Sequence, residues 1–441
     1  MRLLLVSPYF PPQRGAASIR LWALARQACA AGIEVDVLTT AKHPDQVIEW
    51  EGEFTGAVHE IEYQVPRILR SLRKVHKQEE SYSGDGSAES RSGGGASKLI
   101  KGTLGRVRAK TGVYSSVRMP DLTDYWVGPA IEWASEHQKT AAPWDVVVSS
   151  SGPYTAHLAA MEIKKGGHAR AWIAEFRDLW TANQPFKGCF PMTLREGQLE
   201  NRVLRSADGL ATVSRPMGDW LGARSNAPVE VIYNGYNELK PECLTSKSSG
   251  KPSGLGEPIR LVFTGRIYSG NQCPRAILSA LATLRKEGID ITLAVAGSSC
   301  DLWERHAQEL GALDGLELLG VVTHERAIEL QRSASALVAI EWSDPKAGVL
   351  SSKLFEYIAA GPIVLLTGPG GGAMGEMLLR TGRGLHLGES PEKVELSLRS
   401  LIAGEQAFPE PIPSAIEELS RSAQSQRMIE FCQRIAHSAP D

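Results

Sequence analysis

The sequence predicts an α/β protein built from two mainly parallel sheets. Short apolar runs alternate with segments of helical periodicity along most of the 441 residues. A polar stretch, 240–258, interrupts this alternation, which then restarts. The chain is also too long for one ordinary hydrophobic core. Strands that alternate with helices in this way form parallel sheets covered on both faces, so we expect two α/β domains.

Composition fits a soluble globular protein, with 42% hydrophobic and 22% charged residues. The net charge of −2 gives no argument for a nucleic-acid partner. No run approaches the roughly 18 apolar residues that span a bilayer, and the N-terminal LLLV is shorter than a signal-peptide core of about 7 residues. The six cysteines lie far apart without a C-x-x-C pair, which argues against a zinc site and against a disulfide framework. We therefore expect a cytoplasmic protein.

The first domain is predicted over residues 1–240. It opens with the strand RLLLVS, a Pro-rich turn, the helical pattern IRLWALARQACAAG and the alternating strand IEVDVLTT, which together form one βαβ unit. The alternation resumes at DVVVSS (145–150) and continues through AWIAEF and GLATVS to VEVIYNG.

Residues 67–118 differ from the rest of this domain. They contain twelve Lys and Arg against four Asp and Glu, a net charge of +8, and their middle is rich in Gly and Ser. Such a composition predicts a loop rather than packed structure. It is either a solvated insertion or a basic surface that approaches anionic lipid or a phosphorylated acceptor.

The second domain is predicted over 259–412, after a linker at 241–258. Its strands are IRLVFTG, ITLAVAG, LELLG, ALVAIE and PIVLLTG, and its helices are expected at 274–287, 301–311, 324–333, 351–360, 373–380 and 391–403. A C-terminal helix is expected within 413–441, at about 414–437.

Ligands of open parallel sheets bind beyond the carboxyl ends of the strands, so polar or small residues there are candidates. Gly15 and Ala16 follow the first strand and precede a helix, where the backbone could approach an anion or simply form a tight turn. Arg177 and Asp178 directly follow the strand AWIAEF, where charges are either paired with each other or placed at a polar site.

In the second domain Arg266 follows IRLVFTG, and an arginine there can bind a diphosphate through two hydrogen bonds. Ser351 and Ser352 are good N-caps at a helix start, and their amides with Lys353 would form an anion site. Glu356 lies one turn after Ser352 on the same face, where its carboxylate could accept hydrogen bonds from a ribose diol. The Gly-rich turn GPGGGAMGEM (368–377) either approaches a ligand or is a plain loop.

These residues carry a resemblance to family 4 glycosyltransferases with the GT-B fold, nearest to the branch that makes bacterial surface polysaccharides. The similarity spans residues 1–40 and about 144–380, in the order of the family. The stretches that carry it are LLVSPYFPPQRGAAS, SSGPYTAHLAA, WIAEFRDLWTAN, LENRVLRSADGLATVS, VIYNGY, LVFTGRIYSGNQCP and SKLFEYIAAGPIVLL.

The resemblance implies two Rossmann-like domains that face each other across a cleft, with a C-terminal helix that crosses back to the first domain. It implies a nucleotide-sugar donor held by the second domain and a glycan or lipid-linked acceptor held by the first. Family members retain the anomeric configuration and need no catalytic metal, so no cofactor or metal is expected.

By position, Glu356 matches the family's ribose-binding glutamate and Arg266 its diphosphate-binding arginine. The Gly15 loop matches a small-residue loop near the donor phosphates. Arg177 and Asp178 match the strand end that faces the reacting sugar. We therefore expect Arg177, Asp178 and Arg266 to take part in catalysis.

The sequence departs from the family at two positions. Many members carry a second glutamate eight residues before the ribose-binding one, where this chain has Gly348, and a lysine near the position of Asn271. Lys353 could supply the missing positive charge. Glu341 and Asp344 lie near the missing carboxylate in sequence, but nothing in the sequence assigns either to its role. The donor sugar therefore stays open.

Two other functions compete with sugar transfer. One is a sugar-nucleotide epimerase of the same fold, which would consume the donor without an acceptor. The other is a non-catalytic partner that binds nucleotide or glycan, which the glycine at 348 favours.

Overall fold

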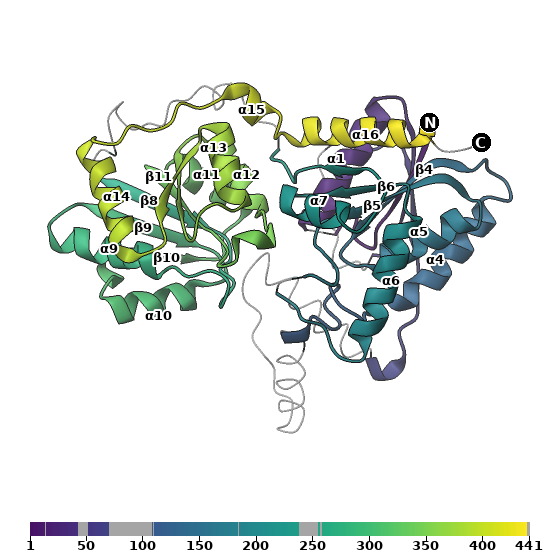
Figure 1. Ribbon diagram of the computed structural model, residues 1–441, viewed down its shortest axis with the longest axis horizontal. Helices are drawn as coiled ribbons and strands as arrows, with labels where there is room; N and C mark the ends of the chain where they lie inside the picture. Colours follow the sequence, from purple (N-terminus) through teal and green to yellow (C-terminus); the bar gives the residue numbers. More distant parts are fainter. Residues whose placement is uncertain are drawn as a thin grey trace. The chain divides into compact units, whose positions relative to one another are not determined.

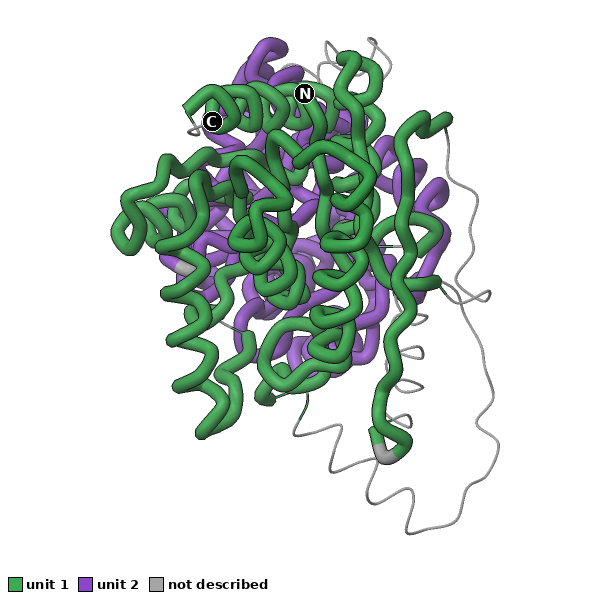
Figure 2. The backbone as a smooth tube through the Cα atoms, turned by 90° about the vertical axis from the view of Figure 1, so that its right-hand side faces the viewer, with its two compact units in different colours: residues 1–77, 89–234, 421–441 green, residues 78–88, 235–420 purple. Residues whose placement is uncertain are grey.

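The computed structural model describes residues 1–13, 15–42, 52–69, 108, 110–183, 185–237, 255 and 258–438. It divides the described chain into two compact units (Figures 1 and 2). Unit 1 combines the chain up to Asn234 with the C-terminal helix, and unit 2 holds the described residues of 235–420. The first unit thus ends at 234 instead of the expected 240, and all but two residues of the expected linker, 241–258, lie outside the described residues.

Unit 1 is built on a seven-stranded sheet in the order β3-β2-β1-β4-β5-β6-β7, and every neighbouring pair is parallel. The strands are β1 (Arg2–Val6), β2 (Glu34–Thr40), β3 (Ala57–Ile61), β4 (Trp144–Ser151), β5 (Ala169–Phe176), β6 (Gly209–Thr212) and β7 (Val229–Val231). The helices are α1 (Ala16–Ala30), α4 (Asp124–His137), α5 (Thr155–Lys165), α6 (Met192–Ser206), α7 (Arg215–Gly222) and α16 (Arg421–Ser438).

Successive residues of β1 point to opposite faces of this sheet, as strand geometry requires. Leu3 and Leu5 join the core beneath α1 and α16, which lie side by side (Figure 1). Leu4 and Val6 join the core beneath α4 and α5. The sheet is therefore buried on both faces, which explains the continuous apolar run of this strand.

The expected helix within 413–441 is two helices, α15 (Pro413–Glu417) in unit 2 and α16 in unit 1. Between them the carbonyl of Leu419 accepts the Tyr236 N–H at 3.1 Å, and the carbonyl of Ile416 accepts the Tyr236 hydroxyl at 2.9 Å. Because these carbonyls bond to Tyr236, the helix is interrupted there. The α16 segment packs on the sheet of unit 1, which confirms the crossing back of the C-terminal helix.

Unit 2 has a six-stranded parallel sheet in the order β10-β9-β8-β11-β12-β13. The strands are β8 (Ile259–Thr264), β9 (Ile291–Ala296), β10 (Leu316–Gly320), β11 (Ala336–Ile340), β12 (Ile363–Thr367) and β13 (Gly384–Gly388). The helices are α9 (Arg275–Lys286), α10 (Cys300–Leu310), α11 (His324–Arg332), α12 (Ser352–Ala360), α13 (Ala373–Thr381) and α14 (Pro391–Ala403). Each helix of 259–403 lies within one or two residues of its predicted position.

Residues 70–107 and 109, most of the basic segment, lie outside the described residues. Within the described part of the chain, no helix is both long enough and apolar enough to cross a bilayer.

Candidate functional site

The carboxyl edge of the unit 2 sheet is made largely of backbone. Five of its six strands end at or directly before a glycine in the left-handed region: Gly265, Gly297, Gly320, Gly368 and Gly388. The sixth strand, β11, has no such glycine and is followed by Glu341. At Gly297 the glycine is required, because a Cβ would lie 1.8 Å from the carbonyl oxygen of Gly265. Because these glycines have no side chains, a ligand can approach the backbone closely at this edge of the sheet.

Two cations lie at the end of β8. The stem of Lys353 crosses over Gly265, since a Cβ on that glycine would lie 2.6 Å from the Lys353 Cδ. Arg266, the next residue, is exposed, and its guanidinium carbon lies 5.3 Å from the centre of the Tyr268 ring. The Tyr268 ring is in turn 5.4 Å from the Trp342 ring. The structure thus brings Lys353 and Arg266 together at one strand end of unit 2.

The start of α12 differs in detail from the prediction. Only Ser351 is an N-cap, and its Oγ accepts the backbone N–H of Lys353 at 3.4 Å. Ser352 is already the first helical residue, because the cap must precede the helix with extended backbone angles. The Lys353 amide is therefore engaged by the Ser351 side chain.

Glu356 lies on α12, one turn after Ser352, and is half-buried. Its Oε2 is buried and has no hydrogen-bond partner among the described residues. A carboxylate oxygen that is removed from water without a partner is costly. This environment differs from a solvent-facing helix position and suits a group that a ligand completes.

The next residue, Tyr357, fixes α12 to the end of β8. Its hydroxyl accepts the N–H of Thr264 at 2.6 Å and donates to the carbonyl of Thr264 at 3.1 Å. Burial raises the pKa of Tyr357 to about 12. This contact holds α12, which carries Lys353 and Glu356, against the end of β8, where Lys353 lies over Gly265.

Gly348, where a carboxylate was expected, ends a short 3₁₀ turn (Pro345–Ala347) with φ +66°. This left-handed conformation disfavours any side chain. Asp344 caps the same turn by accepting the Lys346 N–H at 3.0 Å. Glu341 is 4% exposed and its Oε2 accepts the Gly370 N–H at 2.8 Å, while its Oε1 has no partner within the described chain.

In unit 1, Arg177 joins the ends of β5 and β4. Its Nε donates to the Ser151 carbonyl at 2.7 Å and its Nη2 to the Gly152 carbonyl at 2.8 Å. Asp178 is exposed. Partial removal from water by the surrounding protein raises the pKa of its carboxyl, and the positive charge of Arg177 opposes this rise. The rise is limited because the side chain is exposed to solvent. Arg177 thus binds backbone carbonyls and leaves Asp178 available at the strand end.

Gly15 is the N-cap residue of α1 and makes no side-chain capping hydrogen bond. It is exposed, and the space around the position of a Cβ is open. Ala16 is the first residue of this helix. The helix start is accessible, but it shows no feature that distinguishes an anion site from a turn. The structure places Gly15, Ala16, Arg177 and Asp178 at carboxyl strand ends of unit 1, and Arg266, Ser351, Lys353 and Glu356 at one edge of unit 2.

A buried ion pair in unit 1 was not predicted. Glu175 is 1% exposed, and its Oε1 accepts the Arg20 Nε at 2.9 Å and Nη2 at 2.7 Å. Burial alone would raise the pKa of Glu175. The interactions with Arg20 and the hydroxyl of Ser150 have the larger effect, so the pKa of Glu175 is lowered. The same guanidinium donates to the carbonyls of Ile232 and Tyr233.

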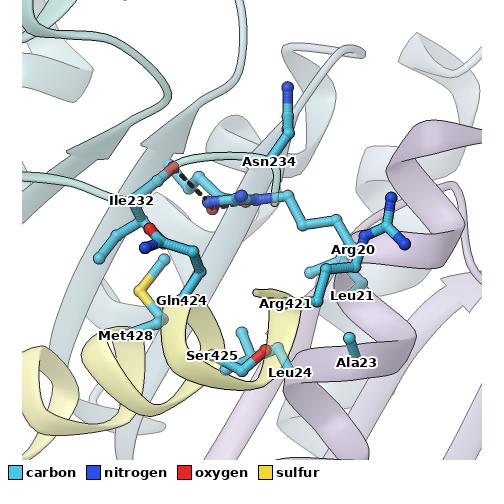
Figure 3. Close-up of a pocket in the computed structure, with 11 residues that line it drawn as sticks. Arg20, Leu21, Ala23, Leu24, Ile232, Asn234, Arg421, Gln424, Ser425 and Met428 are labelled. Atoms are coloured by element: carbon cyan, nitrogen blue, oxygen red, sulfur yellow. Dashed lines mark hydrogen bonds and ion pairs between the residues drawn. The ribbon is translucent and has the colours of Figure 1, made fainter. Parts of the chain in front are cut away.

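A small cavity borders this pair, and Figure 3 shows Arg20 with its bond to Ile232 beside Gln424 of α16. Its volume of about 20 Å³ holds about one water molecule. It is too small for a nucleotide or a sugar. We therefore assign the pair to the packing of α1 and α16 on the sheet.

Among the described residues no group of three or more His, Cys, Asp or Glu side chains is placed to hold a metal ion.

Solved structures share this architecture over nearly the whole chain. A sucrose-phosphate synthase from Thermosynechococcus elongatus has a TM-score of 0.60 and 13% identity, with 99% of this chain and 100% of that one covered. An E. coli structure described as trehalose-6-phosphate bound with UDP-2-fluoro glucose has a TM-score of 0.58 and 13% identity, with 98% and 99% covered. Anabaena Alr3699/HepE in complex with UDP-glucose has a TM-score of 0.53 and 13% identity, with 99% of each covered.

The fold is therefore GT-B, the two-unit fold of many glycosyltransferases. A family model, the glycosyl transferase 4-like domain, matches residues 15–235, and the chain belongs to this family. It is a glycosyltransferase. No curated protein sequence matches the chain.

Proposed function

We propose that this glycosyltransferase moves a sugar, with retention of anomeric configuration, from a nucleoside diphosphate sugar to a lipid-linked or growing glycan of the cell surface. We place the reaction at the cytoplasmic face of the membrane. The observation that carries the proposal is the place of Lys353 over the bare backbone at Gly265, beside Arg266, with Glu356 three residues after Lys353 on the same helix.

Each of these groups suits one part of the donor. When the nucleoside diphosphate leaves, negative charge develops on its phosphates, and nearby fixed cations stabilise that charge. Arg266 and Lys353 are those cations, and the unpartnered oxygen of Glu356 would accept a ribose hydroxyl. Two of the structures with the same fold contain UDP-sugars, so uridine diphosphate sugars are the first donors to test.

Retention without a nucleophile requires attack on the face that the leaving group departs from. The bond from the anomeric carbon to the diphosphate oxygen breaks, the acceptor oxygen bonds to that carbon, and its proton passes to the departing phosphate oxygen. We assign Asp178 to orienting the acceptor hydroxyl, and Arg177 to holding the strand ends from which Asp178 projects. No cofactor or metal enters this scheme.

A panel of nucleotide sugars with lipid-diphosphate acceptors tests the proposal. Arg266→Ala should lower kcat/KM by about 100-fold, in line with the loss of a group that stabilises the transition state. Glu356→Ala should lower kcat/KM by roughly 10- to 100-fold, through a higher KM, because it removes a charge-assisted hydrogen bond to the ribose. Arg260→Ala and Glu392→Ala are matched controls, since Glu392 is exposed, and Arg260, which pairs with Glu317, lies at the opposite end of β8 from Arg266. Unchanged kcat/KM in the first two variants would refute the site. Donor consumption without an acceptor would instead indicate an epimerase.

We propose that Glu341 recognises the donor sugar, since Gly348 has no side chain and the carboxylate of Asp344 caps a turn. Support comes from its buried, unpartnered Oε1, which could accept a sugar hydroxyl. Glu341→Gln should weaken binding of the nucleotide sugar by about tenfold, a typical effect for one charge-assisted hydrogen bond. Binding of the free nucleoside diphosphate should stay unchanged. Equal weakening of both ligands would show that Glu341 only anchors the Gly370 loop.

A lipid-linked acceptor requires that the enzyme reach a membrane, and the basic segment 67–118 is our candidate for an electrostatic contact with anionic lipid. Neutralising its Lys and Arg residues should weaken liposome association. Unchanged association would refute this part of the proposal.

A further inference from the structure

Unit 1 carries an exposed apolar segment at the start of α6. Phe190 is 76% exposed, Leu194 62% and Met192 37%, and Cys189 and Pro191 beside them are exposed as well. We name residues 189–194 the apolar segment. A single exposed hydrophobic residue is ordinary, but three large ones within five positions mark a surface that binds something apolar.

The burial pattern of the N-terminal part of α6 is the reverse of an ordinary surface helix, whereas Val203 and Leu204 near its end are buried in the usual way. Its two carboxylates, Glu196 and Glu200, are fully buried, while Leu194 on its first turn is exposed. Glu196 accepts the Met119 N–H at 2.8 Å and the Trp180 Nε1–H at 3.1 Å. These bonds fix how the helix is rotated, so its first turn must present its apolar side chains to solvent.

Backbone hydrogen bonds also hold the segment. Gly188 donates to the Thr111 carbonyl at 3.0 Å, Thr193 to the Cys189 carbonyl at 3.1 Å, and Leu194 to the Pro191 carbonyl at 3.1 Å. The exposure of Phe190 and Leu194 is therefore a feature of ordered structure. A preorganised apolar surface binds a partner with little loss of conformational entropy.

Exposed cations lie next to the apolar segment. Lys187 and Arg195 flank it and are exposed. Thr111, which accepts the Gly188 N–H at the base of the segment, follows Lys110, which is also exposed. Apolar side chains flanked by cations match the boundary of an anionic bilayer. A second copy of the chain would bring like charges together, and that opposes self-association.

We propose that the apolar segment docks on an anionic lipid bilayer. Phe190, Met192 and Leu194 enter the region between headgroups and acyl chains, and Lys187 and Arg195 face the lipid phosphates. The evidence for it lies on the surface of unit 1. The proposal adds an apolar contact to the electrostatic membrane contact proposed above and rests on that part of the proposed function, but it does not depend on the donor or the chemistry of transfer.

Flotation of the full chain with vesicles of phosphatidylcholine, with and without phosphatidylglycerol, tests the proposal. The wild type should bind the anionic vesicles, and less so at high salt. Phe190→Glu/Leu194→Glu should bind at least about tenfold more weakly, because both side chains lose a favourable transfer and gain a charge. The matched control is Leu379→Glu/Leu396→Glu, which places the same charges at leucines that are 81% and 68% exposed in unit 2, and it should bind like the wild type.

Three results would overturn the proposal: no vesicle binding by the wild type, equal binding by Phe190→Glu/Leu194→Glu, or equal loss in the control pair. A wild-type dimer that Phe190→Glu/Leu194→Glu converts to a monomer, without vesicle binding, would assign the segment to self-association instead. Binding of uridine diphosphate by each variant, measured by calorimetry, shows separately whether the donor site is intact. A failure of that measurement in the wild type counts against the proposed sugar transfer, but leaves the vesicle result standing.

Discussion

Gly265→Ala tests how the donor site is assembled. The change adds one methyl group, which would lie 2.6 Å from Lys353 Cδ and 2.8 Å from its Cε. Carbon atoms cannot approach so closely, so the Lys353 stem must leave its position over the strand end. We expect the Lys353 ammonium to be lost from the diphosphate site although the lysine itself is unchanged.

The magnitude follows from two separate effects. A hydrogen bond to a charged group contributes about 1.5–3 kcal/mol, so the loss of Lys353 should weaken nucleoside diphosphate binding roughly 10- to 150-fold. Gly265 also has φ +126°, where an alanine is strained. That strain should lower the free energy of unfolding by roughly 1–3 kcal/mol.

The assay is calorimetric titration with uridine diphosphate, combined with urea unfolding. Gly288→Ala is the control, because Gly288 has φ +87° but open space at its Cβ position, so it carries the strain without the collision. Lys353→Ala should bind as weakly as Gly265→Ala, and the double variant should lose little more, since the two changes remove the same interaction. Gly265→Ala binding as tightly as Gly288→Ala would refute the reasoning.

Three further changes test the packing around the sites. Glu175→Gln leaves the Arg20 charge buried without its carboxylate and should lower the free energy of unfolding at pH 7 by about 3 kcal/mol. Because the pKa of Glu175 is lowered on folding, its contribution is present above the ordinary value of 4.5 and is lost as pH falls, so urea unfolding at pH 3 should show a smaller deficit. Burial raises the pKa of Asp124 from 3.8 to about 6. The wild type should therefore lose stability relative to Asp124→Asn as pH rises through that interval, which is measured as Tm in buffers on either side of it. If the Tm values of the two proteins change in parallel, this prediction is wrong. Tyr357→Phe removes the acceptor of the Thr264 N–H and should cost about 1–3 kcal/mol in urea unfolding, and an unchanged midpoint would show that another group replaces it.

The alternation of strands and helices predicted the architecture of both units because the strands are buried on both faces. The prediction missed elements whose residues do not form a recognisable apolar pattern. The strand β3 is at the sheet edge, and most of its residues are exposed or half-buried, so it has no apolar run to recognise. The helix α4 contains Pro129, which hides its periodicity. The break between α15 and α16 depends on Tyr236, about 180 residues earlier in the chain.

The site could be predicted only where its residues are close in sequence. The spacing from Ser351 to Glu356 places them on one helix, and the end of the β8 strand placed Arg266 at the sheet edge. The crossing of Lys353 over Gly265 is a tertiary contact that no local pattern encodes. Glu175 offered an overlooked signal: a charged residue inside the apolar run AWIAEF requires a partner. Its partner, Arg20, is 155 positions away and could not be named from the sequence.

The place of α16 has a consequence for how the protein is made. Residues Met428, Phe431 and Cys432 fill the core of unit 1 against Leu21 and Leu24, yet they follow the whole of unit 2 in the sequence and are synthesised after it. One apolar face of unit 1 therefore stays uncovered while the whole of unit 2 is synthesised. Unit 2, whose strands and helices follow one another without such a gap, can fold first. A nascent chain of this protein should consequently depend on chaperones until α16 emerges, and a fragment that stops at residue 234 should aggregate.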